Sequence, residues 1–337
     1  MKNKAFLILE DGTKFAGYSF GSVEPVSGEV VFATNMAGFQ ETLSNPDYRG
    51  RIVVQTFPIV GASGTNGMDS ESKYNAAGYV VREHCPEPSN HRNEETIEQY
   101  MCSRGIGGLY GIDTRQLTRT IRGKNGIRGI ISADENVVVP SAESTAVIAE
   151  PYPVVDCEGA KYNITLVDCG VKNSFLELLH NYGCAINTVP ESDCDACIVA
   201  GGVGNPTESA EALEALQAVV KSGKPVLAVG TAHQLLTVAL GGTLQRLNSA
   251  HNGCNQPVRD CRNGLLYLTK QSHGCAIKDL PQSCEVILEN VVDKSIEGIK
   301  YTSIPVMSLQ FEPSANGGPR NTKYLLEEFL DMIPCRC

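Results

Sequence analysis

The sequence contains no long hydrophobic run. Its only apolar stretch near the N-terminus, Ala5 to Leu9, is too short for the core of a signal peptide and has no small-residue cleavage site behind it. No other run approaches the roughly 20 apolar residues that a membrane-spanning helix needs. We therefore expect a cytoplasmic protein without a membrane partner.

Clusters of basic residues are also missing. The chain has 28 Lys and Arg residues against 38 Asp and Glu residues, which gives a formal net charge of -10. Nucleic-acid backbones and anionic membrane surfaces are held by gathered positive charge. The charge balance therefore argues against a nucleic-acid partner and against an anionic membrane surface.

Cysteine is abundant, but its spacing does not form a disulfide framework. The count of 13 is odd, and the residues are scattered along the chain. We expect reduced thiols in a reducing cytosol, most of them acting as small buried side chains.

The length and the pattern of the 337 residues predict two domains. The first half has short apolar runs separated by turns, at 6–9, 29–33 and 52–56, with helical periodicity only near 94–102 and 114–122. A proline-containing stretch around 137–156 resembles a linker. We predict a mainly β domain over residues 1–150 and a second domain over 160–337.

The second half alternates apolar strands with amphipathic helices. Strands are predicted at 164–167, 185–189, 197–200 and 226–229, and helices at 171–181, 208–222 and from 231 onward. This order predicts an α/β domain with a doubly wound parallel sheet, in which ligands gather at the carboxyl ends of the strands. Two loops lie at such ends, residues 200–206 and 230–234.

The second of these loops carries a family resemblance. The segment Pro225–Leu236 resembles the nucleophile elbow of class I glutamine amidotransferases, which reads Gly-x-Cys-x-Gly-His-Gln. The segment Met307–Ser314 is similar to the block Phe-x-x-Gln-x-His-Pro-Glu, which supplies the histidine and glutamate of that family's Cys-His-Glu triad. Neither segment needs a gap to align with its family motif.

Segments of the first half narrow the resemblance to the small subunit of carbamoyl phosphate synthetase. The similar segments are Leu9–Gly12, Gly28–Phe32, Gly38–Glu41, Asn45–Pro46, Gly64–Asn66 and Ile112–Arg119. The resemblance implies a subunit that hydrolyses glutamine and passes ammonia to a large subunit, which uses ATP and magnesium. It places no cofactor on the small chain, and the carbamoyl phosphate would feed pyrimidine and arginine synthesis.

The catalytic triad implied by the family is missing from this sequence. Gly230 stands at the nucleophile position, Glu312 at the histidine position and Ser314 at the glutamate position. Amide hydrolysis by this route needs a thiolate, a proton-carrying histidine and a carboxylate that orients it. Without the nucleophile, the residual acceleration over water is roughly 10³ to 10⁴ at best. We therefore predict a pseudoenzyme that has lost glutaminase activity.

The neighbourhood of the elbow also departs from the family. The glycines that flank the family nucleophile are replaced by Ala228 and Ala232, and we expect their methyl groups to crowd the turn. Asp47 replaces a serine that helps to bind glutamine, and a buried carboxylate there would repel the carboxylate of the substrate. The positions that the resemblance assigns to the glutamine pocket are Asp47, Gly202, Gly204, Thr231, Gln234, Ser272, Gly274 and Cys275, with Gln310 also matching.

Three alternatives stay open from the sequence. Thr231 could serve as a substitute nucleophile, although we expect its hydroxyl to cap the helix. His251, Cys254, His273 and Cys275 offer a set of zinc-ligand types, but their spacing is not that of a zinc knuckle and we predict no metal. The chain could also be a small-molecule binding protein that is independent of carbamoyl phosphate synthesis.

Overall fold

The computed structural model describes residues 3–124, 126–141, 157, 159–187, 194–202, 204, 210–314 and 319–334. The chain divides into two compact units, Met1–Glu143 with Asn248–Gly253, and Ser144–Leu247 with Cys254–Cys337. The predicted linker prolines Pro151 and Pro153 lie outside the described residues, as do Cys335 and Cys337. None of the helices in the described ranges is long and apolar enough to span a membrane.

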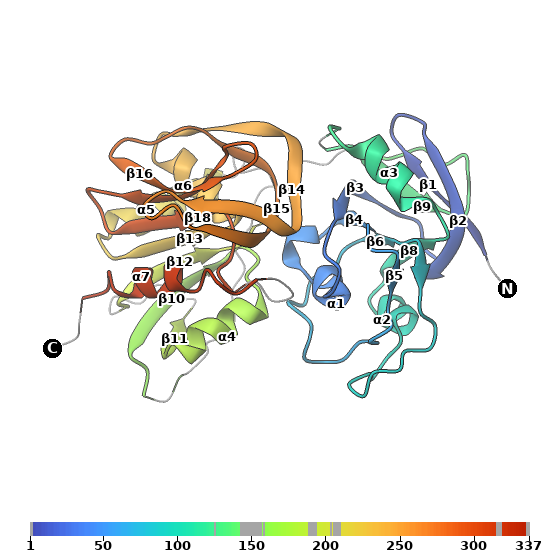
Figure 1. The fold of residues 1–337 in the computed structure, drawn as a ribbon, viewed down its shortest axis with the longest axis horizontal. Coiled ribbons are helices and arrows are strands. Elements are labelled where there is room, and N and C mark those ends of the chain that lie inside the picture. Colours follow the sequence, from blue (N-terminus) through green and yellow to red (C-terminus); the bar gives the residue numbers. More distant parts are fainter. Residues whose placement is uncertain are drawn as a thin grey trace. The chain divides into compact units, whose positions relative to one another are not determined.

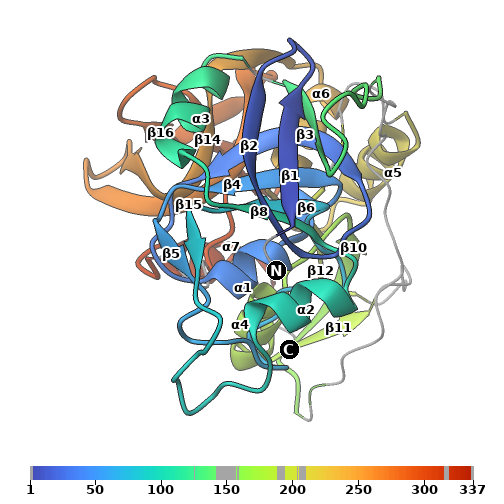
Figure 2. The same cartoon turned by 90° about the vertical axis from the view of Figure 1, so that its right-hand side faces the viewer.

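The first unit contains a closed barrel of seven strands in the order β1-β2-β8-β6-β4-β3-β9, with β1 and β2 at the front in Figure 2. β1 pairs with β2 and β9 in antiparallel fashion, whereas β4 pairs in parallel with both β3 and β6. The strands are β1 (Lys4–Leu9), β2 (Lys14–Gly21), β3 (Val26–Ala33), β4 (Arg51–Gln55), β6 (Gly78–Val80), β8 (Gly107–Tyr110) and β9 (Arg128–Ser132), with the pair β5 (Ile59–Val60) and β7 (Glu83–His84) outside the barrel.

Two helices of the first unit, α2 and α3, start at strong capping residues. Thr96 and Gln99 form a capping box at the start of α2 (Ile97–Ser103), and Asp113 accepts two backbone N–H bonds at the start of α3 (Thr114–Ile121). The remaining helical segments are α1 (Phe39–Leu43) and the 3-10 helix η1 (Pro46–Tyr48). The two helical predictions for this half are confirmed, with a later start for α2.

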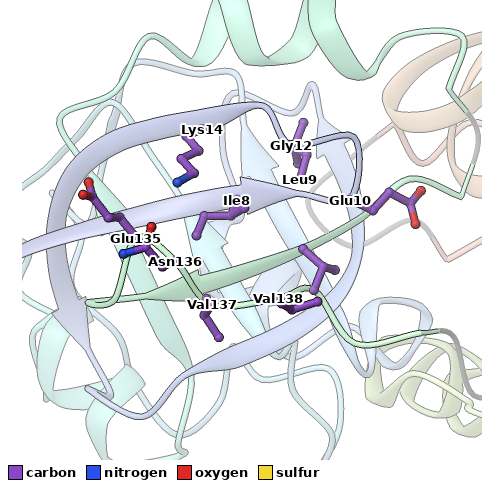
Figure 3. Close-up of a pocket in the computed structure, with 10 residues that line it drawn as sticks. Ile8, Leu9, Glu10, Gly12, Lys14, Glu135, Asn136, Val137 and Val138 are labelled. Atoms are coloured by element: carbon purple, nitrogen blue, oxygen red, sulfur yellow. The ribbon is translucent and has the colours of Figure 1, made fainter.

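A pocket of ≈ 330 Å³ lies on the outside of this barrel (Figure 3). Ile8 forms its apolar part together with Val137 and Val139, while Leu9 points to the barrel core on the other face of β1. Exposed Glu10, Lys14 and Glu135 line its edge. No predicted site residue lies in this pocket.

The second unit is built on a nine-stranded sheet in the order β11-β10-β12-β13-β18-β17-β16-β14-β15 (Figure 1). The first five strands in this order are parallel, and β17 and β16 continue the sheet in antiparallel fashion. The strands are β10 (Tyr162–Asp168), β11 (Cys184–Asn187), β12 (Ala196–Ala200), β13 (Val226–Val229), β14 (Thr243–Asp260), β15 (Leu266–Asp279), β16 (Cys284–Asn290), β17 (Ile296–Tyr301) and β18 (Val306–Leu309).

Helices cover both faces of the parallel part of this sheet, because its strands are apolar on both sides. In β13, Leu227 and Val229 belong to the core under one helix pair, and Val226 and Ala228 belong to the core under the other. The first pair is α4 (Asn173–Asn181) and α7 (Tyr324–Leu330), and the second is α5 (Ala210–Lys221) and α6 (Thr231–Ala239). The predicted doubly wound α/β domain is confirmed, and its antiparallel extension was not predicted.

Candidate functional site

The turn between β13 and α6 places Gly230 at the carboxyl end of a central, fully buried strand. Its backbone has φ 70° and ψ −130°, a region that favours glycine. The Gly230 N–H donates to the Leu309 carbonyl at 2.9 Å, and the Gln310 side-chain Nε2 donates to the Gly230 carbonyl at 3.3 Å. These bonds fix a sharp strand-to-helix turn, which is the geometry of a nucleophile elbow.

The elbow has room for a Cβ atom that it does not carry. A Cβ atom built on Gly230 would lie 3.6 Å from Gly201 Cα and 3.8 Å from Gly201 N, which are ordinary contact distances. Ala228 and Ala232 are fully buried, yet the positive φ of the elbow is retained. Both residues belong to the core cluster beneath α5 and α6, and the expected crowding of the turn by their methyl groups stays a prediction.

The glycine loop after β12 packs against this elbow. Gly201 N–H donates to the Val229 carbonyl at 3.0 Å, and Ala232 N–H donates to the Gly201 carbonyl at 3.2 Å. Gly201 has φ 78°, and a Cβ there would come within 2.1 Å of the Gly170 carbonyl oxygen. A side chain is therefore excluded at Gly201 by contact as well as by conformation. Gly202 and Gly204 also have positive φ, while Val203 and Asn205 lie outside the described residues.

Thr231 is the first residue of α6, and its hydroxyl is engaged. Its Oγ1 donates to the Gly202 carbonyl at 2.7 Å. The residue in the cap position is Gly230, and no side chain caps this helix end. The prediction that Thr231 caps the helix is therefore wrong: its hydroxyl instead ties α6 to the glycine loop.

Glu312, at the position of the family histidine, forms a buried ion pair. Its Oε2 lies 3.2 Å from Nζ of Lys172, and the two side chains are only 5% and 12% exposed. Lys172 immediately precedes α4, so the pair connects the loop after β18 with the start of that helix. A carboxylate held by an ammonium group cannot replace an imidazole that accepts and returns a proton.

Ser314, at the position of the family glutamate, is 6% exposed. Its hydroxyl oxygen is buried and makes no hydrogen bond within the described part of the chain. The hydroxyl has no negative charge with which to orient an imidazole. None of the three triad positions therefore carries the group that glutamine hydrolysis requires.

His233 is the imidazole nearest in sequence to the elbow. It is fully buried, and its Nδ1 shares a hydrogen bond of 2.8 Å with the Ser308 hydroxyl. Burial lowers its pKa to about 4. This neutral side chain fastens α6 to β18.

Gln234 and Gln310 link the elbow to strand β15. The Gln234 side-chain Nε2 donates to the Cys275 carbonyl and to Gln310 Oε1, both at 2.9 Å. The Ser272 hydroxyl oxygen, on the same strand, is buried without a hydrogen-bond partner among the described residues. Gly274 lies between His273 and Cys275 and is half-buried.

A buried polar network that the sequence did not reveal surrounds His273. Its two ring nitrogens face the Cys275 carbonyl at 2.8 Å and Gln271 Oε1 at 3.0 Å. Because both partners are acceptors, the imidazole satisfies them together only when both ring nitrogens carry protons. Fully buried Glu297 lies 3.8 Å away and accepts bonds from Gln271 at 2.9 Å and from Ser295 at 2.7 Å.

The other site predictions fall in different parts of the chain. Asp47 lies in η1 of the first unit, where its N–H donates to Asn45 Oδ1 at 3.0 Å. His251 also belongs to the first unit, whereas Cys254 belongs to the second. Within the second unit, the pair of His273 and Glu297 provides nitrogen and oxygen groups of the types that bind divalent metals. The absence of a metal stays a prediction.

Comparisons with known proteins agree with the elbow geometry. The family described as glutamine amidotransferase class-I matches residues 156–332. The second unit is therefore a class I glutamine amidotransferase domain. Residues 7–131 match the family described as carbamoyl-phosphate synthase small chain, CPSase domain.

Similarity to curated relatives extends over nearly the whole chain. A carbamoyl phosphate synthase small chain from Clostridium perfringens is 34% identical over 345 residues, covering 97% of this chain and 99% of the relative. Small chains from Fusobacterium nucleatum and Bacillus thuringiensis are each 36% identical, covering 97% and 98% of this chain and 97% and 96% of their own lengths. The chain belongs to the carbamoyl phosphate synthase small chain family, as its motifs predicted.

Proposed function

We propose that this protein is a small subunit that has lost glutamine hydrolysis and acts as a structural or regulatory partner of a large carbamoyl phosphate synthetase subunit. The observation that carries the proposal is the elbow at Gly230, which has the backbone geometry of a nucleophile elbow and room for a Cβ atom but carries no nucleophile. Glu312 and Ser314 support the same proposal, because they stand in place of the family's histidine base and the glutamate that orients it.

The retained fold is the reason to expect a partner. The hydrogen bonds of Gly201, Thr231 and Gln310 still build the elbow and its glycine loop, although no reaction there requires them. Retention of an intact domain without its chemistry is expected when its surface serves an assembly. In the proposed complex, ATP and magnesium act on the large subunit, and ammonia comes from solution. Carbamoyl phosphate formed there would serve pyrimidine or arginine synthesis.

Reconstitution with a large subunit from the same organism tests the proposal. The two chains should co-purify, and the pair should form carbamoyl phosphate from ammonium, ATP and bicarbonate but not from glutamine. A matched pair with a glutaminase-competent small chain provides the positive control for glutamine. Glutamine-dependent synthesis by the pure complex would contradict the loss of activity. Failure of the chains to associate would contradict the partner role.

The alternative of Thr231 as nucleophile has less support. Its hydroxyl donates to the Gly202 carbonyl at 2.7 Å, and an attacking hydroxyl would need a base to take that proton. Treatment with an electrophilic glutamine analogue followed by mass spectrometry distinguishes the two readings. The proposal predicts no adduct on Thr231.

A further inference from the structure

Two cysteines at the start of β12 form a site that lies at the opposite end of the strand from the glycine loop. Cys194 precedes the strand and Cys197 lies within it. Cys197 is 6% exposed, whereas Cys194 is half-buried, and both pack in the core cluster beneath α5 and α6. The pair is therefore part of the folded domain, and Cys194 is the more exposed of the two residues.

Lys224 is held beside Cys194 by the pairing of β12 with β13. Cys197 N–H donates to the Pro225 carbonyl at 2.9 Å, and Cys197 is opposite Val226 in the parallel register. This pairing brings Nζ of Lys224 to 3.1 Å from the Cys194 sulfur. An ammonium group at that distance stabilises a thiolate more than a thiol.

The two thiols have opposite tendencies to ionise. Burial acts to raise the pKa of Cys194, but the neighbouring polar groups, among them the hydrogen bond and the charge of Lys224, outweigh it, so the pKa is lowered. Burial, together with the neighbouring charge of Cys194, raises the pKa of Cys197 to about 12. Of the two thiols, Cys194 is therefore the one that ionises more readily.

Other thiols of the chain provide a contrast. Burial, with the charge of Glu98, raises the pKa of Cys102, and burial, with the charges of Glu289 and Asp260, raises the pKa of Cys261. Both residues are exposed, whereas Cys194 is half-buried. Accessibility alone would make Cys102 and Cys261 the faster-reacting thiols, whereas the charge environment favours Cys194.

We propose that Cys194 is a reversible thiol-modification site that reacts with low-molecular-weight disulfides. In the reaction, the Cys194 thiolate attacks one sulfur of the disulfide, a new S–S bond joins Cys194 to that half, and the original S–S bond breaks. The other half leaves as a thiolate and takes a proton from water. Cys194 is oxidised to a mixed disulfide, one half of the reagent is reduced to a free thiol, and excess thiol reverses the step.

Competitive labelling within one protein tests this site without any variant. The full chain is treated at about pH 7 with limiting glutathione disulfide, and separately with iodoacetamide, and each cysteine is quantified by peptide mass spectrometry. Cys194 should react at least ~3-fold faster than Cys102 and Cys261 with both reagents. Equal or slower reaction at Cys194 would overturn the proposal.

Substitution of the neighbouring lysine identifies the cause. Lys224→Gln should slow labelling of Cys194 at neutral pH and move its pH dependence upward, whereas Lys224→Arg should keep the fast reaction. Lys221→Gln is the matched control, because Lys221 is an exposed lysine at the end of α5. Unchanged labelling in Lys224→Gln, with Cys102 and Cys261 reacting as before, would overturn the role of the ion pair.

Discussion

Gly230→Ala tests whether the elbow has room for a Cβ atom at Gly230. The methyl group would meet Gly201 Cα at 3.6 Å, so contact adds little cost. The backbone at φ 70° and ψ −130° is unfavourable for alanine, and such strain costs about 1 to 3 kcal/mol. The alanine also lowers the conformational entropy of the unfolded chain, which offsets about 0.4 to 1 kcal/mol of this cost. We expect a net loss of about 1 to 2 kcal/mol from the stability of the second unit.

Two other glycines separate conformation from contact. Gly223 has φ 72° and nothing within 4 Å of an added Cβ, so Gly223→Ala measures a positive-φ cost alone. Gly201→Ala adds an overlap with the Gly170 carbonyl oxygen at 2.1 Å and should be the most damaging of the three. The expected order of destabilisation is Gly201→Ala, then Gly230→Ala, then Gly223→Ala.

Hydrogen exchange of the β12 and β13 amides is the suitable assay, because it reports opening of the second unit separately from the first. A loss of about 1.4 kcal/mol corresponds to a tenfold faster exchange by global opening of that unit. If Gly230→Ala were as destabilising as Gly201→Ala, the elbow would have no room for a side chain. The account of an emptied nucleophile position would then be refuted.

Two further predictions concern buried charge. Burial holds the pKa of His233 at about 4 in the folded state, against an ordinary value near 6.5, so its contribution to stability is present above pH 6.5 and is lost as the pH falls toward 4. The free energy of unfolding should therefore decline between pH 6.5 and about pH 5, and His233→Gln should remove about 2 kcal/mol of that decline. Urea unfolding of both proteins across this pH range measures the difference. Lys172→Met should lower the stability by about 3 kcal/mol, because it leaves the Glu312 carboxylate buried without the Lys172 ammonium group. Adding Glu312→Gln to the same chain should recover much of the lost stability. If thermal unfolding shows no recovery in the double variant, the ion pair is not the cause of the loss.

The parallel half of the second unit could be predicted because each of its elements has its own signal. The apolar run at 226–229 is buried on both faces and coincides with β13, and the helical pattern from Thr231 coincides with the start of α6. The antiparallel part could not be predicted in the same way. β14 and β15 alternate irregularly between buried and exposed positions, so neither strand nor helix periodicity stands out.

The closed barrel of the first unit depends on pairings between distant segments. β1 pairs with β9 across more than a hundred residues, and nothing in either strand specifies the partner. The short apolar runs therefore predicted strands but not closure.

At the candidate site, the sequence predicted which catalytic groups are missing but not which contacts the replacing residues make. The sequence predicted the loss of the family's catalytic triad, because the family motifs align Gly230, Glu312 and Ser314 with its nucleophile, histidine and glutamate positions. The ion pair of Glu312 with Lys172 and the network around Glu297 could not be read from the sequence, since their members come from separate elements and meet only in the folded unit. The room for a Cβ atom at Gly230 likewise depends on how the glycine loop packs against the elbow in the fold.

Release of glutamate from glutamine tests the central claim most directly. The purified chain is assayed with and without the large subunit, beside a small chain that retains the Cys-His-Glu triad. The account predicts glutamate release by this chain that stays at the uncatalysed background under both conditions, because Gly230 offers no atom to attack the amide. Glutamate release comparable to that of the control chain would contradict it.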